Sequence, residues 1–83
     1  MQNKVFVGNL SWGITDDQLR DFFAQAGNVV EAKVIFDRVS GRSKGYGFVT
    51  FETEEEAAKA VEMFDGQEFD GRQINVSIAR PRN

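Results

Sequence analysis

The alternation of apolar and polar residues predicts four β-strands in this chain. Successive side chains on a strand point to opposite faces, so every second residue belongs to the same side. The pattern indicates strands over Lys4–Leu10, Val29–Asp37, Lys44–Phe51 and Gln73–Ala79. The apolar run Val34-Ile35-Phe36 leaves the register of the second strand open. In the other three strands the predicted inward residues are Val5, Val7, Gly45, Gly47, Val49, Phe51, Ile74, Val76 and Ile78.

Two amphipathic helices are predicted between these strands, over residues 15–26 and 53–65. Each begins with a capping box, in which a threonine is followed three residues later by Gln18 or Glu56. Gly27 and Gly66 stand where glycine commonly ends a helix. The spacing i, i+3, i+4, i+7 gives each helix one apolar stripe. The stripes consist of Leu19, Phe22, Phe23 and Ala26, and of Ala57, Ala60, Val61 and Phe64.

The predicted order of elements is β-α-β-β-α-β. This order suits an α+β fold of the ferredoxin-like type, a four-stranded antiparallel sheet with both helices on one face. Gln67–Arg72 is predicted to be a connector, with Phe69 pointing inward. We expect one domain over residues 1–83, with a core from 4 to 80.

Three aromatic residues fall on the sheet face that the helices leave open. Phe6, Tyr46 and Phe48 all occupy outward positions of their strands, where an exposed antiparallel strand usually carries polar residues. Large apolar groups gathered on an open face typically mark a binding surface.

Composition narrows the possible functions. The chain has no histidine and no cysteine, which removes disulfides, thiol chemistry, most zinc sites and the usual general base. The net charge is −3, but the predicted helices hold eight of the 13 acidic residues and only two of the 10 basic ones. The strands and loops are therefore net positive, which favours a phosphate-bearing partner on that side. Acidic helix faces are also ordinary solvated surface.

An enzyme is not indicated. Asp16-Asp17 and Glu54-Glu55-Glu56 stand at helix starts, where carboxylates interact favourably with the positive end of the helix dipole. Gly41–Gly45 superficially resembles a phosphate-binding loop, but its spacing fits neither common glycine-rich motif. We expect no catalysis, no cofactor and no metal.

The octapeptide Lys44–Phe51 (KGYGFVTF) matches the RNP1 pattern of the RNA recognition motif at all seven specified positions. Val5–Leu10 (VFVGNL) fits the RNP2 hexamer of the same family, about forty residues earlier. The chain therefore resembles an RNA recognition motif domain from Lys4 to about Arg80. The sequence around Gly8–Trp12 is similar to that of the glycine-rich and organellar RNA-binding proteins of plants and their bacterial and cyanobacterial relatives.

The resemblance implies that the two motif strands are neighbours at the centre of the sheet. Phe6 and Phe48 would then stack on two successive bases of single-stranded RNA, with Tyr46 near the sugars or a further base. In the second strand, Ala32 and Val34 would face the helices, and Lys33 and Ile35 the open surface. The other implied contacts, to base edges or phosphates, are Lys4, Lys33, Ile35, Arg42, Lys44, Asn75, Ser77, Ala79, Arg80 and Arg82. Gln2 or Asn3 could join them.

Some alternatives stay open. The rings could instead support a protein-interaction module, since some RNA recognition motifs bind peptides or have covered sheets. Trp12 fits either a packing role or ligand contact, and the stretch Arg38–Ser43 fits either a plain hairpin or phosphate contact. We expect a monomer inside the cell with no membrane association; the cytoplasm is the first expectation, and the nucleus or an organelle stays open. Single-stranded DNA is a further possible ligand.

Overall fold

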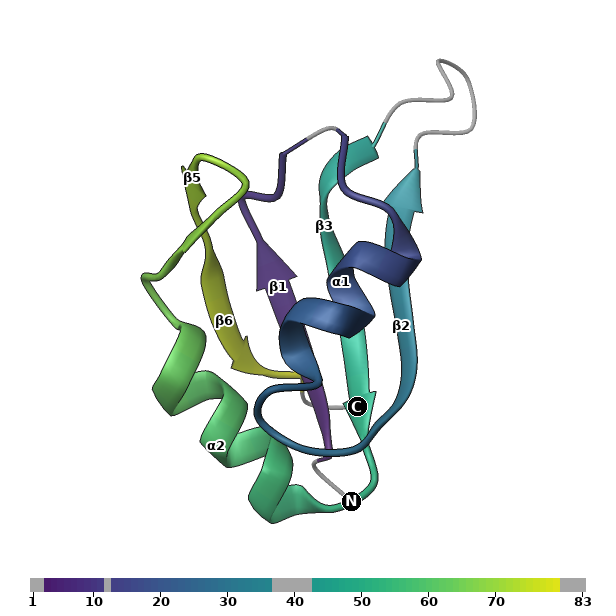
Figure 1. The fold of residues 1–83 in the computed structure, drawn as a ribbon, viewed down its shortest axis with the longest axis vertical. Coiled ribbons are helices and arrows are strands. Elements are labelled where there is room, and N and C mark those ends of the chain that lie inside the picture. Colours follow the sequence, from purple (N-terminus) through teal and green to yellow (C-terminus); the bar gives the residue numbers. More distant parts are fainter. Residues whose placement is uncertain (1–2, 12, 37–42, 80–83) are drawn as a thin grey trace.

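Four strands form one antiparallel sheet in the computed structural model of the chain, which describes residues 3–11, 13–36 and 43–79. In spatial order they are β2 (Val29–Phe36), β3 (Ser43–Phe51), β1 (Lys4–Gly8) and β6 (Asn75–Ile78). The two strands that carry the sequence motifs, β1 and β3, are therefore adjacent and central, as the resemblance implied (Figure 1).

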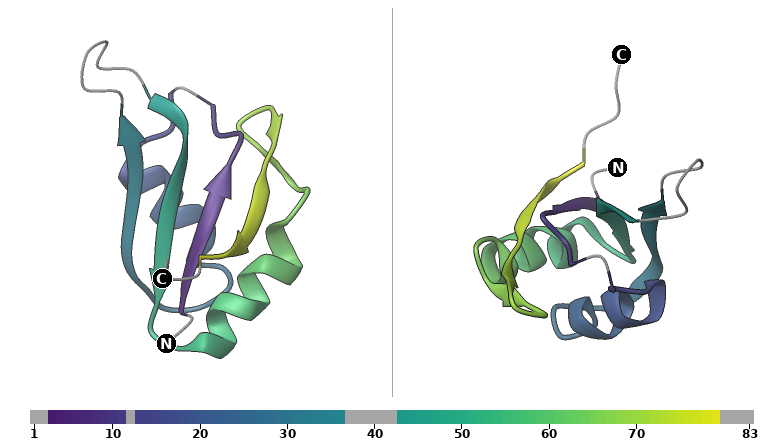
Figure 2. Two further views of the ribbon diagram at one scale, coloured as in Figure 1. Left: turned by 180° about the vertical axis from the view of Figure 1, so that it is seen from behind. Right: turned by 90° about the horizontal axis from the view of Figure 1, so that it is seen from above.

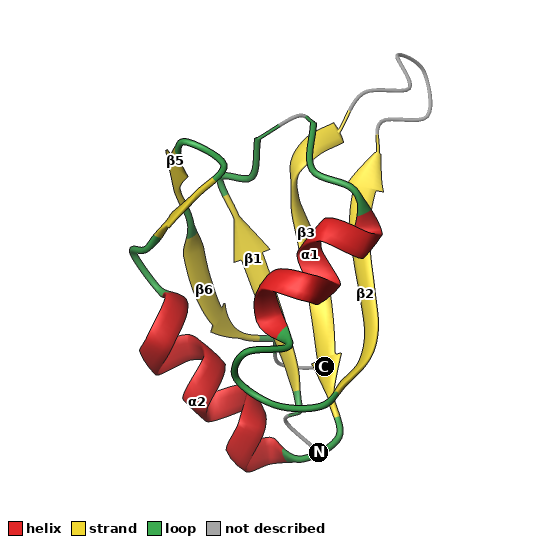
Figure 3. Cartoon of the chain, in the orientation of Figure 1, coloured by secondary structure: helices red, strands yellow, loops and turns green. Residues whose placement is uncertain are grey.

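Both helices lie on the same face of this sheet. Helix α1 (Asp16–Phe23) and helix α2 (Glu54–Phe64) cover it side by side, and the view from above shows them together on one side (Figure 2). No other described helix or strand lies over the opposite face, which is seen from behind in the same figure. The predicted ferredoxin-like α+β arrangement is confirmed (Figure 3).

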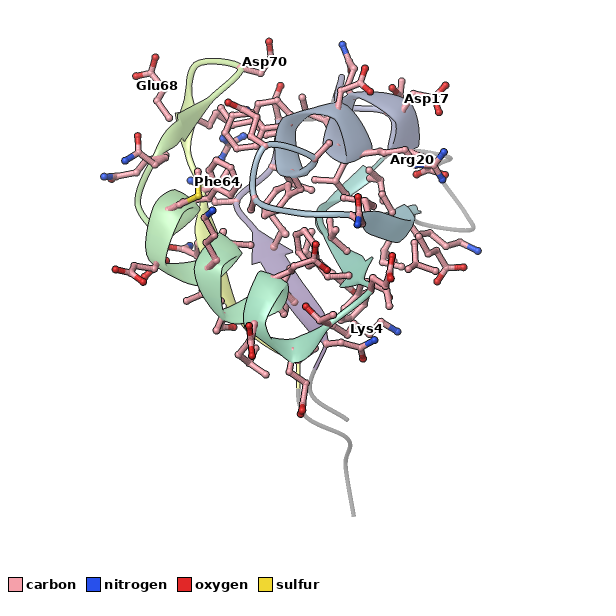
Figure 4. All side chains as sticks on the ribbon, turned by 60° about the horizontal axis from the view of Figure 1, so that its bottom comes forward. Lys4, Asp17, Arg20, Phe64, Glu68 and Asp70 are labelled. Atoms are coloured by element: carbon pink, nitrogen blue, oxygen red, sulfur yellow. The ribbon has the colours of Figure 1, made fainter. Side chains whose placement is uncertain are left out.

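The core lies between the helices and the sheet. Phe23 stands at its centre, with its ring centroid 4.9 Å from that of Phe64 and 6.4 Å from that of Phe51. Phe64 projects from α2 into this layer (Figure 4). Ala32 and Val34 are buried while Lys33 is exposed, which confirms the implied register of β2. The remaining buried apolar residues are Val5, Val7, Leu10, Ile14, Leu19, Ala26, Val49, Ala57, Ala60, Ile74 and Val76.

Both predicted capping boxes are present. In α1, the Gln18 backbone N–H donates to Thr15 Oγ1 at 3.2 Å, and the Thr15 backbone N–H donates to Gln18 Oε1 at 2.9 Å. The predicted end of this helix is wrong, because it closes at Phe23 rather than at Ala26. A tight turn follows, in which the Ala26 N–H donates to the Phe23 carbonyl at 3.0 Å. This turn still brings Ala26 into the core.

Gly27 therefore does not end α1 but leaves room for a side chain of α2. A Cβ atom on Gly27 would lie 2.5 Å from Glu56 Oε2. That oxygen accepts a hydrogen bond from the Asn28 N–H at 2.7 Å, while Oε1 accepts one from the Thr53 N–H at 3.1 Å. The carboxylate thus caps α2 and ties it to the turn after α1. The bond from Asn28, with those from Thr53, holds the pKa of Glu56 below its ordinary value.

Glu56→Gln is expected to lower the melting temperature at pH 7, because one amide oxygen cannot replace both carboxylate acceptors. Glu56 has a depressed pKa in the folded state, so its contribution is present above the unfolded-state pKa. The contribution is lost as the pH falls through the folded-state pKa, and the two melting curves should converge in acid.

The control is Glu55→Gln, which removes the same charge from the same helix turn, where Glu55 is exposed. Thermal melts at a series of pH values compare the three proteins. A difference between wild type and Glu56→Gln that stays constant with pH would refute the assigned role of the carboxylate.

The chain after α2 differs from the prediction. The expected connector contains a small hairpin, β4 (Glu68–Phe69) paired with β5 (Arg72–Gln73), and the expected strand Gln73–Ala79 is divided at Ile74. Ile74 donates its N–H to the Gln67 carbonyl at 2.9 Å and accepts from the Gly66 N–H at 2.9 Å. Its backbone thus pairs with the turn that follows α2 instead of with β1. Ile78 was predicted to point inward, and its side chain is only half-buried.

Candidate nucleic-acid interface

Three aromatic rings meet on the open face of the sheet. Phe6 of β1 and Phe48 of β3 are directly opposite each other in the antiparallel register, and their ring centroids are 5.7 Å apart at an interplanar angle of 67°. Tyr46 is two residues along β3, with its ring 5.6 Å from Phe6 at 34°. All three rings are half-exposed. We call Phe6, Tyr46 and Phe48 the ring platform.

Gly8 makes room for the Phe6 ring. Gly8 shares the open face with Phe6 yet is buried, because the ring lies over it: a Cβ atom on Gly8 would be 3.1 Å from Phe6 Cε1. Strand β1 ends here instead of at Leu10, since Asn9 adopts a left-handed backbone with φ 60°. Tyr46, the register partner of Gly8, therefore lies level with the end of β1, beside the turn.

Polar residues lie beside the rings on the neighbouring strands of the sheet. Lys33 of β2 is the register partner of Phe48, and Ser77 of β6 is the partner of Phe6. Asn75 is the partner of Gly8, one row further along. These three side chains are exposed on the platform side. They flank the rings at both sides of the sheet, where hydrogen-bonding groups can reach the edge of a stacked aromatic ligand.

Lys4 places a cation on the platform. Its Nζ lies over the Phe48 ring, 4.9 Å from the centroid, which is within cation–π range. Ile35 and Ala79 are half-exposed, and the Ala79 N–H donates to the Lys4 carbonyl at 2.8 Å, so that backbone donor is already used. A ligand base above Phe48 has to share or displace the Lys4 ammonium.

Several predicted contacts lie outside the described residues. They are Gln2, Trp12, Arg38, Arg42, Arg80 and Arg82. Lys44 belongs to β3, but its side chain is also outside the description. The described part of the proposed contact set is therefore the ring platform with Lys4, Lys33, Ile35, Asn75, Ser77 and Ala79.

Asn9 and Arg72, which the sequence analysis did not single out, meet beside the ring platform. Asn9 Nδ2 donates to the Gln73 carbonyl at 2.6 Å, and Arg72 Nη2 donates to Asn9 Oδ1 at 2.8 Å. The two residues are 63 positions apart, so no local pattern links them. The available signal is Asn9 itself, since asparagine following a strand commonly marks a left-handed turn.

One acidic residue at each helix start has a structural partner. Asp16 Oδ1 accepts from the Val34 N–H at 2.7 Å, which joins α1 to β2, and Glu56 makes the contacts described above. Within residues 3–11, 13–36 and 43–79, no three acidic side chains gather in a way that could hold a metal ion. Neither described helix has the length and apolar character needed to cross a membrane.

Comparisons with known proteins agree with this geometry. The sequence model of the RNA recognition motif matches residues 5–75. The chain is 55% identical over 80 residues to the chloroplast RNA-binding protein CP29B of Arabidopsis thaliana, covering 96% of this chain and 28% of that protein. It is 52% identical over 82 residues to the mitochondrial glycine-rich RNA-binding protein 2 of the same plant, covering 99% of this chain and 52% of the relative. The chain thus spans about a quarter to a half of these relatives.

Solved structures show the same fold. The Rna15 RRM with bound RNA (GU) has a TM-score of 0.86 and 30% identity to this chain, and the match covers 98% of this chain and 86% of the other. The resemblance to plant organellar proteins and the ferredoxin-like fold are both confirmed by these matches.

Proposed function

The chain belongs to the RNA recognition motif family, and on that basis we propose that its ring platform binds single-stranded RNA without catalysis. The observation that carries the proposal is the position of Phe6, Tyr46 and Phe48 on the sheet face that no described element covers. These rings contribute little to the core, which lies on the other side of the sheet. Stacking with unpaired bases accounts for them.

The platform supplies affinity for any base. Stacking contributes about 1–3 kcal/mol per base and tolerates every base, because each has a π-face. The tilt of 67° between Phe6 and Phe48 means that two bases lying flat on both rings cannot be parallel. Single-stranded RNA can splay its bases in this way, whereas a duplex cannot.

We assign discrimination among bases to the polar side chains that flank the rings. Lys33, Asn75 and Ser77 stand beside the rings in the register, where a base edge would project. Ile35, the backbone near Ala79 and Arg80 complete the proposed contacts to the bases. Lys4, Arg42, Lys44 and Arg82 are proposed to contact phosphates, so affinity should fall with rising salt.

Competition between single-stranded and duplex RNA tests this proposal. A labelled degenerate single-stranded RNA of about ten nucleotides is bound to the wild-type protein and followed by fluorescence anisotropy. The same RNA, annealed to its complement, is expected to compete at least about tenfold more weakly, because its bases are not free to stack. Equal competition by the duplex would mean that phosphates alone are recognised, and the stacking proposal would fail.

The domain extent, the oligomeric state, the range of ligands and the location belong to the same proposal. We propose one domain over residues 1–83, acting as a monomer that also accepts single-stranded DNA in place of RNA. RNA chaperoning or post-transcriptional regulation fits a small platform of modest selectivity. We propose an intracellular location; the two plant relatives are named as chloroplast and mitochondrial proteins, so an organelle is the first compartment to examine.

A further inference from the structure

A hollow lies beside the ring platform, at the end of the sheet where β1 stops. It has a volume of about 500 Å³, within the range of small-ligand pockets. Phe6 and Tyr46 line it with aromatic rings, and Asn9, Arg72 and Asn75 line it with polar side chains. Aromatic rings together with a guanidinium and two amides suit a nucleotide, which combines a flat base with hydrogen-bond acceptors.

Asn9 fixes the Arg72 side chain within this hollow. Its amide bridges two partners, since Nδ2 donates to the Gln73 carbonyl at 2.6 Å and Oδ1 accepts from Arg72 Nη2 at 2.8 Å. The hairpin β4–β5 is thereby attached to the end of β1. A guanidinium held by one hydrogen bond loses less side-chain freedom when it binds a ligand.

Most of the donor capacity of Arg72 remains available. A guanidinium has five N–H donors, and the bond to Asn9 uses one of them. No hydrogen bond or ion pair joins the Arg72 side chain to a described residue other than Asn9, although Glu68 and Asp70 lie on the same hairpin (Figure 4). Acidic neighbours would weaken a purely electrostatic attraction, so directed hydrogen bonds are the stronger basis for binding here.

We propose that this hollow is a further nucleotide subsite, in which Arg72 donates to a pair of acceptors on a nucleotide adjoining the one on Phe6. This inference rests on the proposed function of the ring platform. Gly8, which lines the hollow, is two residues from Phe6 along β1, a distance of about 6.5 Å that an unstacked nucleotide step can span. The acceptors are either phosphate oxygens or the O6 and N7 atoms of guanine, both of which match the guanidinium fork.

The test compares dissociation constants for a two-nucleotide RNA and for RNAs extended by one nucleotide at either end. The wild-type protein is expected to gain about tenfold in affinity from the extension at one end, as for one charge-assisted hydrogen-bonded contact. Arg72→Gln should lose this gain while keeping the wild-type affinity for the two-nucleotide RNA. Arg20→Gln on α1 is the control, because it removes the same charge from the helix side.

Asn9→Gly tests whether Asn9 positions Arg72, since glycine accepts the φ of 60° but lacks the amide. It should reduce only the gain from the added nucleotide, a selectivity that a general loss of structure would not produce. A gain that depends on a guanine at the added position identifies base-edge contact. A gain independent of the base, with a weaker salt dependence in Arg72→Gln, identifies phosphate contact.

The subsite is refuted if the extension adds nothing at either end, or if Arg72→Gln weakens binding of all RNAs by the same factor. In either case the two-nucleotide RNA still binds, and the ring platform stands. If the wild-type protein binds none of these RNAs, the proposed function itself fails. The two failures are therefore distinguishable.

Discussion

Replacing Phe51 by alanine is expected to lower the free energy of unfolding by about 3–5 kcal/mol. Its side chain is fully buried at the inner face of β3, with its ring centroid 6.4 Å from that of Phe23. Truncation leaves a cavity between the sheet and α1, and the β3 backbone there is anchored by a bond of 2.7 Å from the Phe51 N–H to the Asn3 carbonyl. This loss is a large part of the roughly 5–15 kcal/mol that stabilises a typical domain. Urea denaturation measures it.

Val30→Ala is the matched control, because this large apolar residue on β2 is 62% exposed. Its substitution should change stability by no more than about 0.5 kcal/mol, as for surface sites in general. Phe22→Ala should have an intermediate effect, since Phe22 is only half-buried beside Phe69. A Phe51→Ala protein as stable as the control would show that the register of β3 is wrong.

Removing the platform rings is expected to weaken RNA binding without unfolding the protein. Phe6→Ala and Phe48→Ala should each reduce the binding free energy by about 1–3 kcal/mol, because each ring is proposed to stack on one base. Their rings face away from the core, so the loss of stability should be much smaller than for Phe51→Ala. Fluorescence anisotropy and thermal denaturation of the same samples give the two quantities.

Phe22→Ala serves here as the opposite control. It removes a phenyl ring from α1, on the helix side of the sheet. This ring stacks on that of Phe69, with the two centroids 4.1 Å apart. Its binding constant should match that of the wild type at a temperature where both proteins are folded. If Phe48→Ala lost melting temperature and RNA affinity in parallel, its ring would be structural and the platform interpretation would not hold.

The faces of the strands could be predicted from the sequence because they follow from local alternation. Once Val5 and Val7 are taken as core, Phe6 has to point to the other face, and the same holds for Phe48 between Gly47 and Val49. The helix starts were equally predictable, since a capping box is complete within four residues. These features need no information from distant parts of the chain.

Features set by backbone pairing outside the regular alternation and helix periodicity were not predictable. The hairpin β4–β5 and the break at Ile74 arise because the Gly66 and Gln67 backbone pairs with Ile74, which competes with the alternating pattern of Gln73–Ala79. The early end of α1 reflects a turn, stabilised by the bond between Ala26 and Phe23, that keeps Ala26 buried.

The contact between Asn9 and Arg72 beside the ring platform was missed because it is long-range. The bond between Asn9 and Arg72 joins residues that only the folded sheet brings together. Asn9 lies within the predicted strand Lys4–Leu10, where alternation alone gives it no special role, and Arg72 lies in a segment that was predicted to be a plain connector. Its place beside the platform became evident only from the contacts of the hairpin.

The most direct test of the central claim is an NMR titration of the wild-type protein with a short degenerate single-stranded RNA at low and moderate salt. We predict that amide shifts concentrate on Phe6, Lys33, Tyr46, Phe48 and the segment 75–80, and that they shrink as the salt concentration rises. Amides in that group that stay unchanged in a folded protein, while RNA is in excess, would contradict the claim. The platform would then be assigned to a protein partner.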